Sequence, residues 1–193
     1  PLRHGNGCRV EGNIFLGGGV RGAGGLRIIG EDHVVVNNLV TGTKGRAGGA
    51  VSLQAGIVDS PLAGYFQVKN TVIAFNTFVD NPGPLFDLAA GHGSRGCVLL
   101  PESTLIANNL LVGGPEAAPM LVDRPATPGI RWEGNLAAGG TLGRETATGV
   151  TTVPDAGLER GADGFWRVAP ASPARGAAVL GDALRDACAR QGI

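Results

Sequence analysis

Short apolar runs alternate with polar positions along most of the chain, and single asparagines punctuate them at regular intervals. One motif recurs five times: an apolar residue, two variable positions, an asparagine, one further position and a second apolar residue. Its asparagines are Asn13, Asn38, Asn76, Asn109 and Asn135, at intervals of 25, 38, 33 and 26 residues. The short runs around them have no helical period. They predict strands of about three to five residues joined by tight turns.

A repeat of about 24 residues with loop insertions accounts for these intervals, and periods in this range are typical of solenoids, propellers or arrays. The dense leucine register of leucine-rich repeats is missing, and a propeller blade needs about 40 residues or more. The sequence therefore predicts an all-β fold, a parallel β-helix with coils about 4.8 Å apart. The asparagines are expected to form a ladder at one corner, with their own backbones in the left-handed conformation.

The first strand of each coil supplies an outward-facing column. Its middle residues are Arg3, Arg27, Ser52 and Asp87. Because Arg3 and Arg27 lie 24 residues apart at the same phase of the repeat, we expect them to sit one above the other on adjacent coils. A purely structural coil has no reason to stack like charges about 5 Å apart. The pair therefore predicts an anion-binding row.

Insertions rich in glycine, serine and proline interrupt the coils at about residues 41–50, 54–70 and 89–103. Loops on one side of a solenoid often build its binding face. Tyr65 and Arg95 are the substrate-binding candidates in these loops. The pattern weakens after about residue 140, which predicts β-helix coils over residues 1–140 and an irregular C-terminal segment over residues 141–193. A short helix near residues 179–190 is expected to cap the solenoid end.

The composition supports this interpretation. Glycine accounts for 34 of 193 residues, about two and a half times the usual ~7%, and 43% hydrophobic content excludes wholesale disorder. The net charge is zero, but residues 1–46 carry six cations and three acids, which suits a polyanionic partner. The three cysteines have no zinc-binding spacing and do not suggest a disulfide scaffold. Neither a membrane span nor a signal peptide is recognised.

Two segments carry a family resemblance. Leu2-Arg3-His4-Gly5-Asn6, the stretch over residues 10–17 and the stretch over residues 25–33 resemble polysaccharide lyase family 6, which contains chondroitinase B and alginate lyases. The match is specific over about residues 2–40 and fades after about residue 140. The resemblance implies a right-handed parallel β-helix of the pectin-lyase type. It also implies β-elimination of an acidic polysaccharide such as alginate or chondroitin or dermatan sulfate.

The resemblance also implies roles for individual residues. Arg3 corresponds to the family's general acid toward the leaving O4. Arginine is an unusual acid, since its pKa is above about 12, so Arg3 is expected mainly to stabilise developing charge. Arg27 corresponds to a residue that contacts substrate carboxylate or sulfate. His4 either assists Arg3 or fills the core, and His33 suits a core position better.

The family's lysine base and its calcium ligands precede the segment that matches Arg3. The chain is therefore expected to be the C-terminal part of a catalytic β-helix, with no metal ligands of its own and no activity by itself. Calcium is expected as cofactor of the full-length enzyme. The expected partner is an anionic polysaccharide, not nucleic acid or a membrane, and the expected location is secreted or periplasmic. A non-catalytic β-helix module that binds acidic polysaccharide and a purely structural solenoid remain as alternatives.

Overall fold

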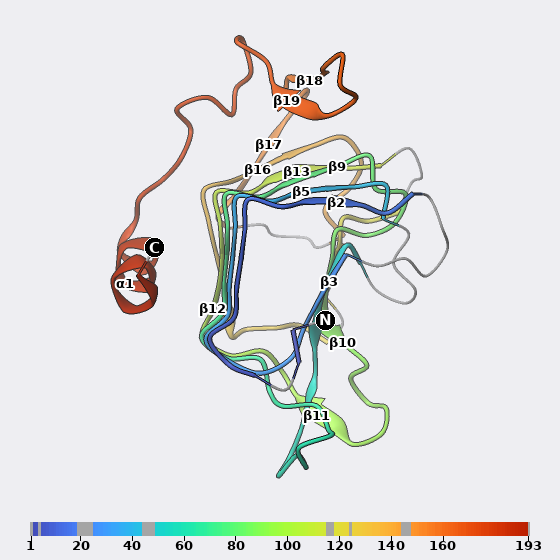
Figure 1. Cartoon of the computed structure of the whole chain (residues 1–193), viewed down its shortest axis with the longest axis vertical. Coiled ribbons are helices and arrows are strands. Elements are labelled where there is room, and N and C mark those ends of the chain that lie inside the picture. Colours follow the sequence, from blue (N-terminus) through green and yellow to red (C-terminus); the bar gives the residue numbers. More distant parts are fainter. Residues whose placement is uncertain are drawn as a thin grey trace.

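Three parallel sheets form the body of the protein, and the coils are stacked so that each sheet runs along the stack (Figure 1). The computed structural model describes residues 2–3, 5–18, 25–43, 49–114, 118–123, 125–143 and 148–192. The fold is the parallel β-helix that the asparagine repeat predicts. Its short strands follow from runs of alternating residues that end at glycine, asparagine or aspartate turns.

Each sheet takes one strand from successive coils. Sheet A consists of β3 (Leu26–Ile28), β6 (Val51–Gln54), β10 (Phe86–Ala90) and β14 (Leu121–Val122). Sheet B consists of β1 (Arg9–Glu11), β4 (Val34–Val36), β8 (Val72–Ala74), β12 (Thr104–Ala107) and β15 (Ile130–Glu133). Sheet C consists of β2 (Ile14–Leu16), β5 (Leu39–Thr41), β9 (Thr77–Val79), β13 (Leu110–Val112), β16 (Asn135–Ala138) and β17 (Val150–Val153). The parallel stack therefore continues past residue 140, to Val153.

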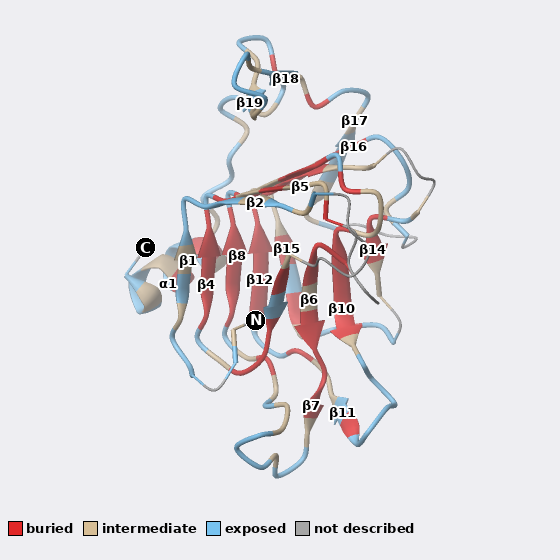
Figure 2. Ribbon diagram, turned by 45° about the vertical axis from the view of Figure 1, so that its right-hand side comes forward, coloured by how far each residue is buried: buried red, intermediate tan, exposed pale blue. Residues whose placement is uncertain are grey.

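The two apolar positions of the motif form two inward columns. In sheet B, Val10, Val35, Ile73, Ile106 and Trp132 are register partners on successive strands. In sheet C the column is Phe15, Val40, Phe78, Leu111 and Ala137. These columns and the inner residues of sheet A belong to one core (Figure 2). Inside it, Phe86 packs edge-on against Phe78 and Trp132, with ring centroids 5.0 and 5.9 Å apart. Aromatic rings favour such edge-to-face contacts.

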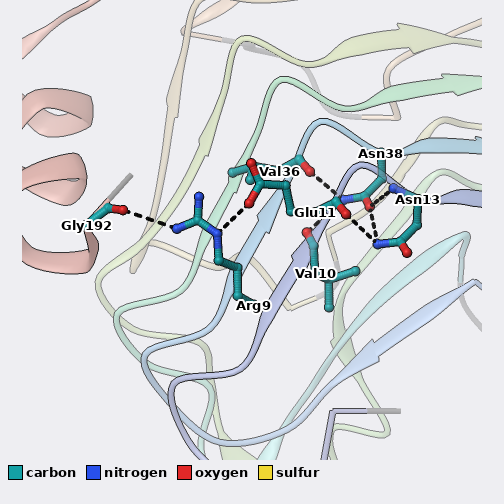
Figure 3. A network of polar contacts seen from close by, with 7 residues as sticks. All are labelled: Arg9, Val10, Glu11, Asn13, Val36, Asn38 and Gly192. Atoms are coloured by element: carbon teal, nitrogen blue, oxygen red, sulfur yellow. Dashed lines mark hydrogen bonds and ion pairs between the residues drawn. The ribbon is translucent and has the colours of Figure 1, made fainter.

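The predicted asparagine ladder is present at the corner between sheets B and C. The Nδ2 of Asn13, Asn38, Asn76 and Asn109 donates to Oδ1 of the next asparagine in the series, which ends at Asn135, over 2.9–3.0 Å. The same oxygens accept the backbone N–H groups of the preceding asparagines. Figure 3 shows the first rung, between Asn13 and Asn38.

The backbone conformation at this corner differs from the prediction. The residue before each ladder asparagine has positive φ: Gly12, Asn37, Phe75, Asn108 and Gly134, with φ between 51° and 66°. The ladder asparagines themselves were expected in this conformation, and that expectation was wrong. The preceding residue makes the turn, while the asparagine backbone N–H stays aligned with the neighbouring amide oxygen.

The C-terminal segment runs back along the outside of the solenoid. The antiparallel pair β18 (Leu158–Arg160) and β19 (Trp166–Val168) adjoins sheet C, where Leu158 and Val168 pack near Leu110 and Ala138. Helix α1 (Asp182–Gln191) then places Leu184 and Ala187 against the apolar outer face of β4, β8 and β12.

The sequence predicted this helix as a cap. Figure 1 shows it instead beside sheet B, along the flank of the stack and not over its end. Its last turn reaches the first coil, where Arg9 Nη1 donates to the Gly192 carbonyl over 3.3 Å (Figure 3). Among the described residues, α1 is the one helix, and it is not long and apolar enough to cross a membrane.

Candidate functional site

The outer face of sheet A carries the predicted polar column. Arg27 is the register partner of Ser52, and Ser52 is the partner of Asp87. Their strand neighbours Leu26, Ile28, Val51 and Leu53 are buried in the core. Because side chains alternate between the two faces of a strand, the column faces outward. The order of these three positions is as predicted.

Arg3 lies on the same face, but its register was wrongly predicted. Leu2 bridges Ile28, two residues further along β3 than the repeat suggests. The Leu2 N–H donates to the Arg27 carbonyl over 2.8 Å, and the Leu2 carbonyl accepts from the Ile29 N–H over 3.1 Å. A shift of two residues preserves the alternation of a strand, so Leu2 still packs against the core and Arg3 is still exposed.

An insertion from the third coil brings Tyr65 to both arginines. This insertion leaves the solenoid at β7 (Gly56–Ile57), which pairs in antiparallel fashion with β11 (Cys97–Leu99) of the insertion in the fourth coil. The Ile57 N–H donates to the Tyr65 carbonyl over 2.8 Å. The guanidinium carbons of Arg3 and Arg27 lie 5.3 and 5.0 Å from the centre of the Tyr65 ring. Both distances are within the range of cation–π attraction.

Each guanidinium has one further fixed partner. Arg3 Nη2 donates to the carbonyl of Ala63, in the same insertion as Tyr65. Arg27 donates through Nε, over 3.0 Å, and through Nη2 to Oε1 of Gln54. Sequence reasoning missed Gln54. The only feature of the sequence that points to Gln54 is its polar side chain at the second outward position of β6, the strand that carries Ser52.

The described residues supply no counter-charge to the two arginines. In the described part of the chain, neither Arg3 nor Arg27 forms an ion pair with a carboxylate. The nearest acid in the column is Asp87, which is 7% exposed. Burial raises the pKa of its carboxyl above the ordinary value, and the Ala89 N–H lowers it by a smaller amount. Two exposed cations beside one tyrosine therefore make this face the candidate site for an anion.

The other predicted residues are placed as follows. Arg95 is exposed, with φ of 52°, in the turn between β10 and β11. Within the described residues, no hydrogen bond, ion pair or ring contact joins it to Arg3, Arg27 or Tyr65. His4 lies outside the described residues. The substrate roles of Arg95 and His4 stay predictions.

His33 is a fully buried core residue, in line with the sequence interpretation. Its Nδ1 accepts the Cys8 N–H over 3.2 Å, and its Nε2 lies 3.0 Å from the Ile29 carbonyl. These partners fit a neutral ring with the proton on Nε2. Burial lowers the pKa of this imidazole, against a smaller opposite effect of the Ile29 carbonyl.

The described residues do not fit a metal ion. No group of three or more His, Cys, Asp or Glu side chains among them is arranged to hold one. Glu11 is paired with Arg9 over 2.6 Å (Figure 3), and this hydrogen bond lowers the pKa of the Glu11 carboxyl. No catalytic step is therefore assigned to calcium on these residues.

Comparisons with known proteins agree with the geometry of the fold. The sequence model of the chondroitinase B family matches residues 1–175. The structure of AlyGC, an alginate lyase of polysaccharide lyase family 6, is 28% identical, with a TM-score of 0.74 over 86% of this chain and 22% of that chain. A mannuronic acid specific family 6 lyase from human gut microbiota is 26% identical, with a TM-score of 0.64 over 80% of this chain and 36% of that one.

The chain thus spans about a fifth to a third of the length of these two lyases. No match was found among curated protein sequences. The family match covers most of the chain, including the segments that carry Arg3, Arg27 and the asparagine ladder. The chain belongs to the chondroitinase B family of lyases, within polysaccharide lyase family 6.

Proposed function

We propose that the outer face of sheet A binds an acidic polysaccharide, and that this chain forms part of a lyase that cleaves uronate chains by β-elimination. The observation that carries the proposal is the pair of exposed arginines at one tyrosine ring, without a carboxylate partner among the described residues. Guanidinium groups bind carboxylates and sulfates through paired hydrogen bonds and stay charged at all relevant pH values.

The reaction assigns the two arginines different roles. In β-elimination a base removes the C5 proton, the electron pair forms the C4–C5 double bond, and the C4–O4 bond breaks. Negative charge develops on O4 until a proton arrives. We place Arg3 at this oxygen, where a fixed cation stabilises the charge as it forms. Arg27 holds an anionic group of the neighbouring sugar.

The base is not assigned to a described residue. The backbone of Lys69 forms isolated parallel β-bridges with Glu31 and Glu102. Its side-chain Nζ lies 3.7 Å from a Glu102 carboxylate oxygen. Neither contact joins it to Arg3. We retain the expectation that a lysine outside this chain removes the proton. The secreted or periplasmic location is part of the same proposal, because the substrate is a polymer found outside cells.

The test is the absorbance of unsaturated uronate, measured with the complete lyase of which this chain is proposed to form part (called the intact protein below), with calcium, on alginate, dermatan sulfate and chondroitin sulfate. We expect product absorbance on at least one of them. Arg27→Ala is expected to raise KM about ten- to a hundredfold with a smaller effect on kcat, because it removes a charge-assisted contact of about 1.5–3 kcal/mol. Absence of product on all three polymers would contradict the lyase proposal.

The second candidate, a module that binds acidic polysaccharide without cleaving it, is favoured by the same arginine pair and by the engagement of Lys69 with Glu102. It predicts retarded migration of the intact protein in gels containing alginate, relieved by salt, with no product absorbance. Retardation that survives the double change Arg3→Ala and Arg27→Ala would place the binding surface elsewhere.

A further inference from the structure

Gln54 links three coils beneath the arginine pair. It is the last residue of β6 in the third coil, and its side chain is almost fully buried, at 1% exposure. Its Oε1 accepts two N–H groups of Arg27 in the second coil. Its Nε2 donates to the Ala90 carbonyl of the fourth coil over 2.7 Å and to the Ala55 carbonyl over 3.2 Å. A buried polar side chain with all of these partners is held in one position.

The surrounding backbone is shaped to admit this amide. The pairing of β10 with β6 is irregular between Asp87 and Ala90, so that Ala90 stands opposite Gln54. Gly91 follows with φ of 76°, and a Cβ atom there would lie 2.7 Å from Nε2 of Gln54. Such irregularities often re-aim side chains next to functional sites. Because Nε2 is directed to two carbonyls, the amide oxygen must face Arg27.

This arrangement leaves part of Arg27 free. A guanidinium has five N–H groups, and Gln54 takes one on Nε and one on Nη2. None of the described residues accepts a hydrogen bond from the three remaining N–H groups, which include both on Nη1, so the outer edge of the guanidinium is open to an anion. An amide accepts these hydrogen bonds and leaves the guanidinium charge uncompensated. An aspartate or glutamate at this position would neutralise that charge.

We propose that Gln54 is a positioning residue for substrate recognition: it fixes the Arg27 guanidinium with its outer edge free while leaving its charge uncompensated. This inference rests on the proposed role of the arginine pair. A held guanidinium loses less conformational freedom when substrate binds, and ordering one long side chain costs about 0.5–1.5 kcal/mol. Removing the Gln54 amide should therefore weaken substrate binding only by its effect on Arg27.

The experiment measures KM and kcat of the intact protein on an alginate oligosaccharide for Gln54→Met, Arg27→Ala and the double variant. Gln67→Met is the matched control, because Gln67 Nε2 also donates to a carbonyl, that of Leu100, over 2.7 Å, but no described arginine is hydrogen-bonded to it. We expect Gln54→Met to raise KM about three- to tenfold with kcat within about twofold. We expect Gln67→Met to leave KM within about twofold of wild type.

The double variant separates positioning from a general structural effect. If Gln54 acts through Arg27, Gln54→Met adds no further rise in KM once Arg27 is alanine. An unchanged KM in Gln54→Met, or a full additional rise in the Arg27→Ala background, would overturn the inference. If Gln54→Met does not fold, Gln54→Asn carries the same expectation, since it is one methylene too short to reach both Arg27 and Ala90. A wild-type protein without turnover would instead refute the proposed function.

Discussion

The asparagine corner and the outer face of sheet A are built on opposite principles, although both run along the same stack of coils. At the corner, every coil contributes the same residue to the same hydrogen bond, from Asn13 to Asn135. On the outer face, successive coils contribute an arginine, a serine and an acid at one register position. Insertions then add Tyr65 and the pairing of β7 with β11.

This difference separates scaffold from site. A repeated residue satisfies a requirement that every coil shares, namely pairing the polar groups of a buried turn. A varied column has no such shared purpose, and the two cations on this face, Arg3 and Arg27, repel each other unless an anion joins them. The protein thus keeps its coils in register at one corner and is free to vary the chemistry on another face.

The largest expected effect on stability is at the centre of the ladder. In Asn76→Ala, the buried Asn38 backbone N–H and Nδ2 lose the Oδ1 that both donate to, and Asn109 Oδ1 and the Val35 and Ala74 carbonyls each lose a donor. Each such group costs about 1–3 kcal/mol, so we expect a loss of about 3–5 kcal/mol in the free energy of unfolding, measured with urea. Asn13→Ala, at the exposed end of the ladder, should cost about 1 kcal/mol. Equal losses at both positions would contradict the ladder as a buried cooperative network.

The next largest effect is expected at Tyr65, whose ring lies in the insertion and contacts both arginines. Tyr65→Ala removes cation–π contacts to Arg3 and Arg27, each about 0.5–1 kcal/mol at an exposed site. We expect affinity for an alginate oligosaccharide to fall about tenfold in isothermal titration. Tyr65→Phe keeps the ring and should bind within about twofold of wild type. A large loss in Tyr65→Phe would show that the hydroxyl, and not the ring, carries the effect.

A smaller effect is expected from pH. The folded-state pKa of His33 is lowered by burial, so the unfolded chain binds this proton more readily, with a pKa of about 6.5. The stability that depends on the neutral imidazole is present above this value and is lost as pH falls below it, by at most about 1.4 kcal/mol per pH unit. Thermal unfolding between pH 8 and pH 5 measures the slope. His33→Gln should flatten it, and an unchanged slope in this variant would contradict the prediction.

The smallest effect is expected at Asp87, whose pKa is raised by burial. Its folded form binds a proton more readily than the unfolded chain does, so ionisation lowers stability as pH rises through the folded pKa. Asp87→Asn keeps an oxygen for the Ala89 N–H and should raise the melting temperature slightly at pH 7, with no gain at pH 3. A loss of stability at pH 7 would show that the ionised carboxylate has a stabilising partner.

The sequence predicts the scaffold better than the site, for physical reasons. The inward columns that pass through Val35 and Val40 follow from periods that every coil repeats. The shift of Leu2 to Ile28 leaves no trace in the sequence, because a two-residue slip conserves the inward and outward pattern.

The partners of the arginines were equally hard to foresee. Tyr65 was a candidate from the composition of its loop, but its contact with Arg3 depends on how the insertion folds back over 61 intervening residues of chain. Gln54 is polar at an outward position, which predicts exposure. Its burial arises because Ala90 and Cys97 of the next coil cover it.

We propose that Arg3 acts on the reacting atoms, whereas the asparagine corner only holds the coils together. The most direct test is kcat of Arg3→Ala in the intact protein, with unsaturated uronate as the product measured and urea unfolding as the check on the fold. We expect turnover to fall at least about a hundredfold, as for loss of a charge-stabilising group, and the free energy of unfolding to change by less than about 1 kcal/mol. An unchanged kcat in a folded Arg3→Ala protein would contradict this proposal.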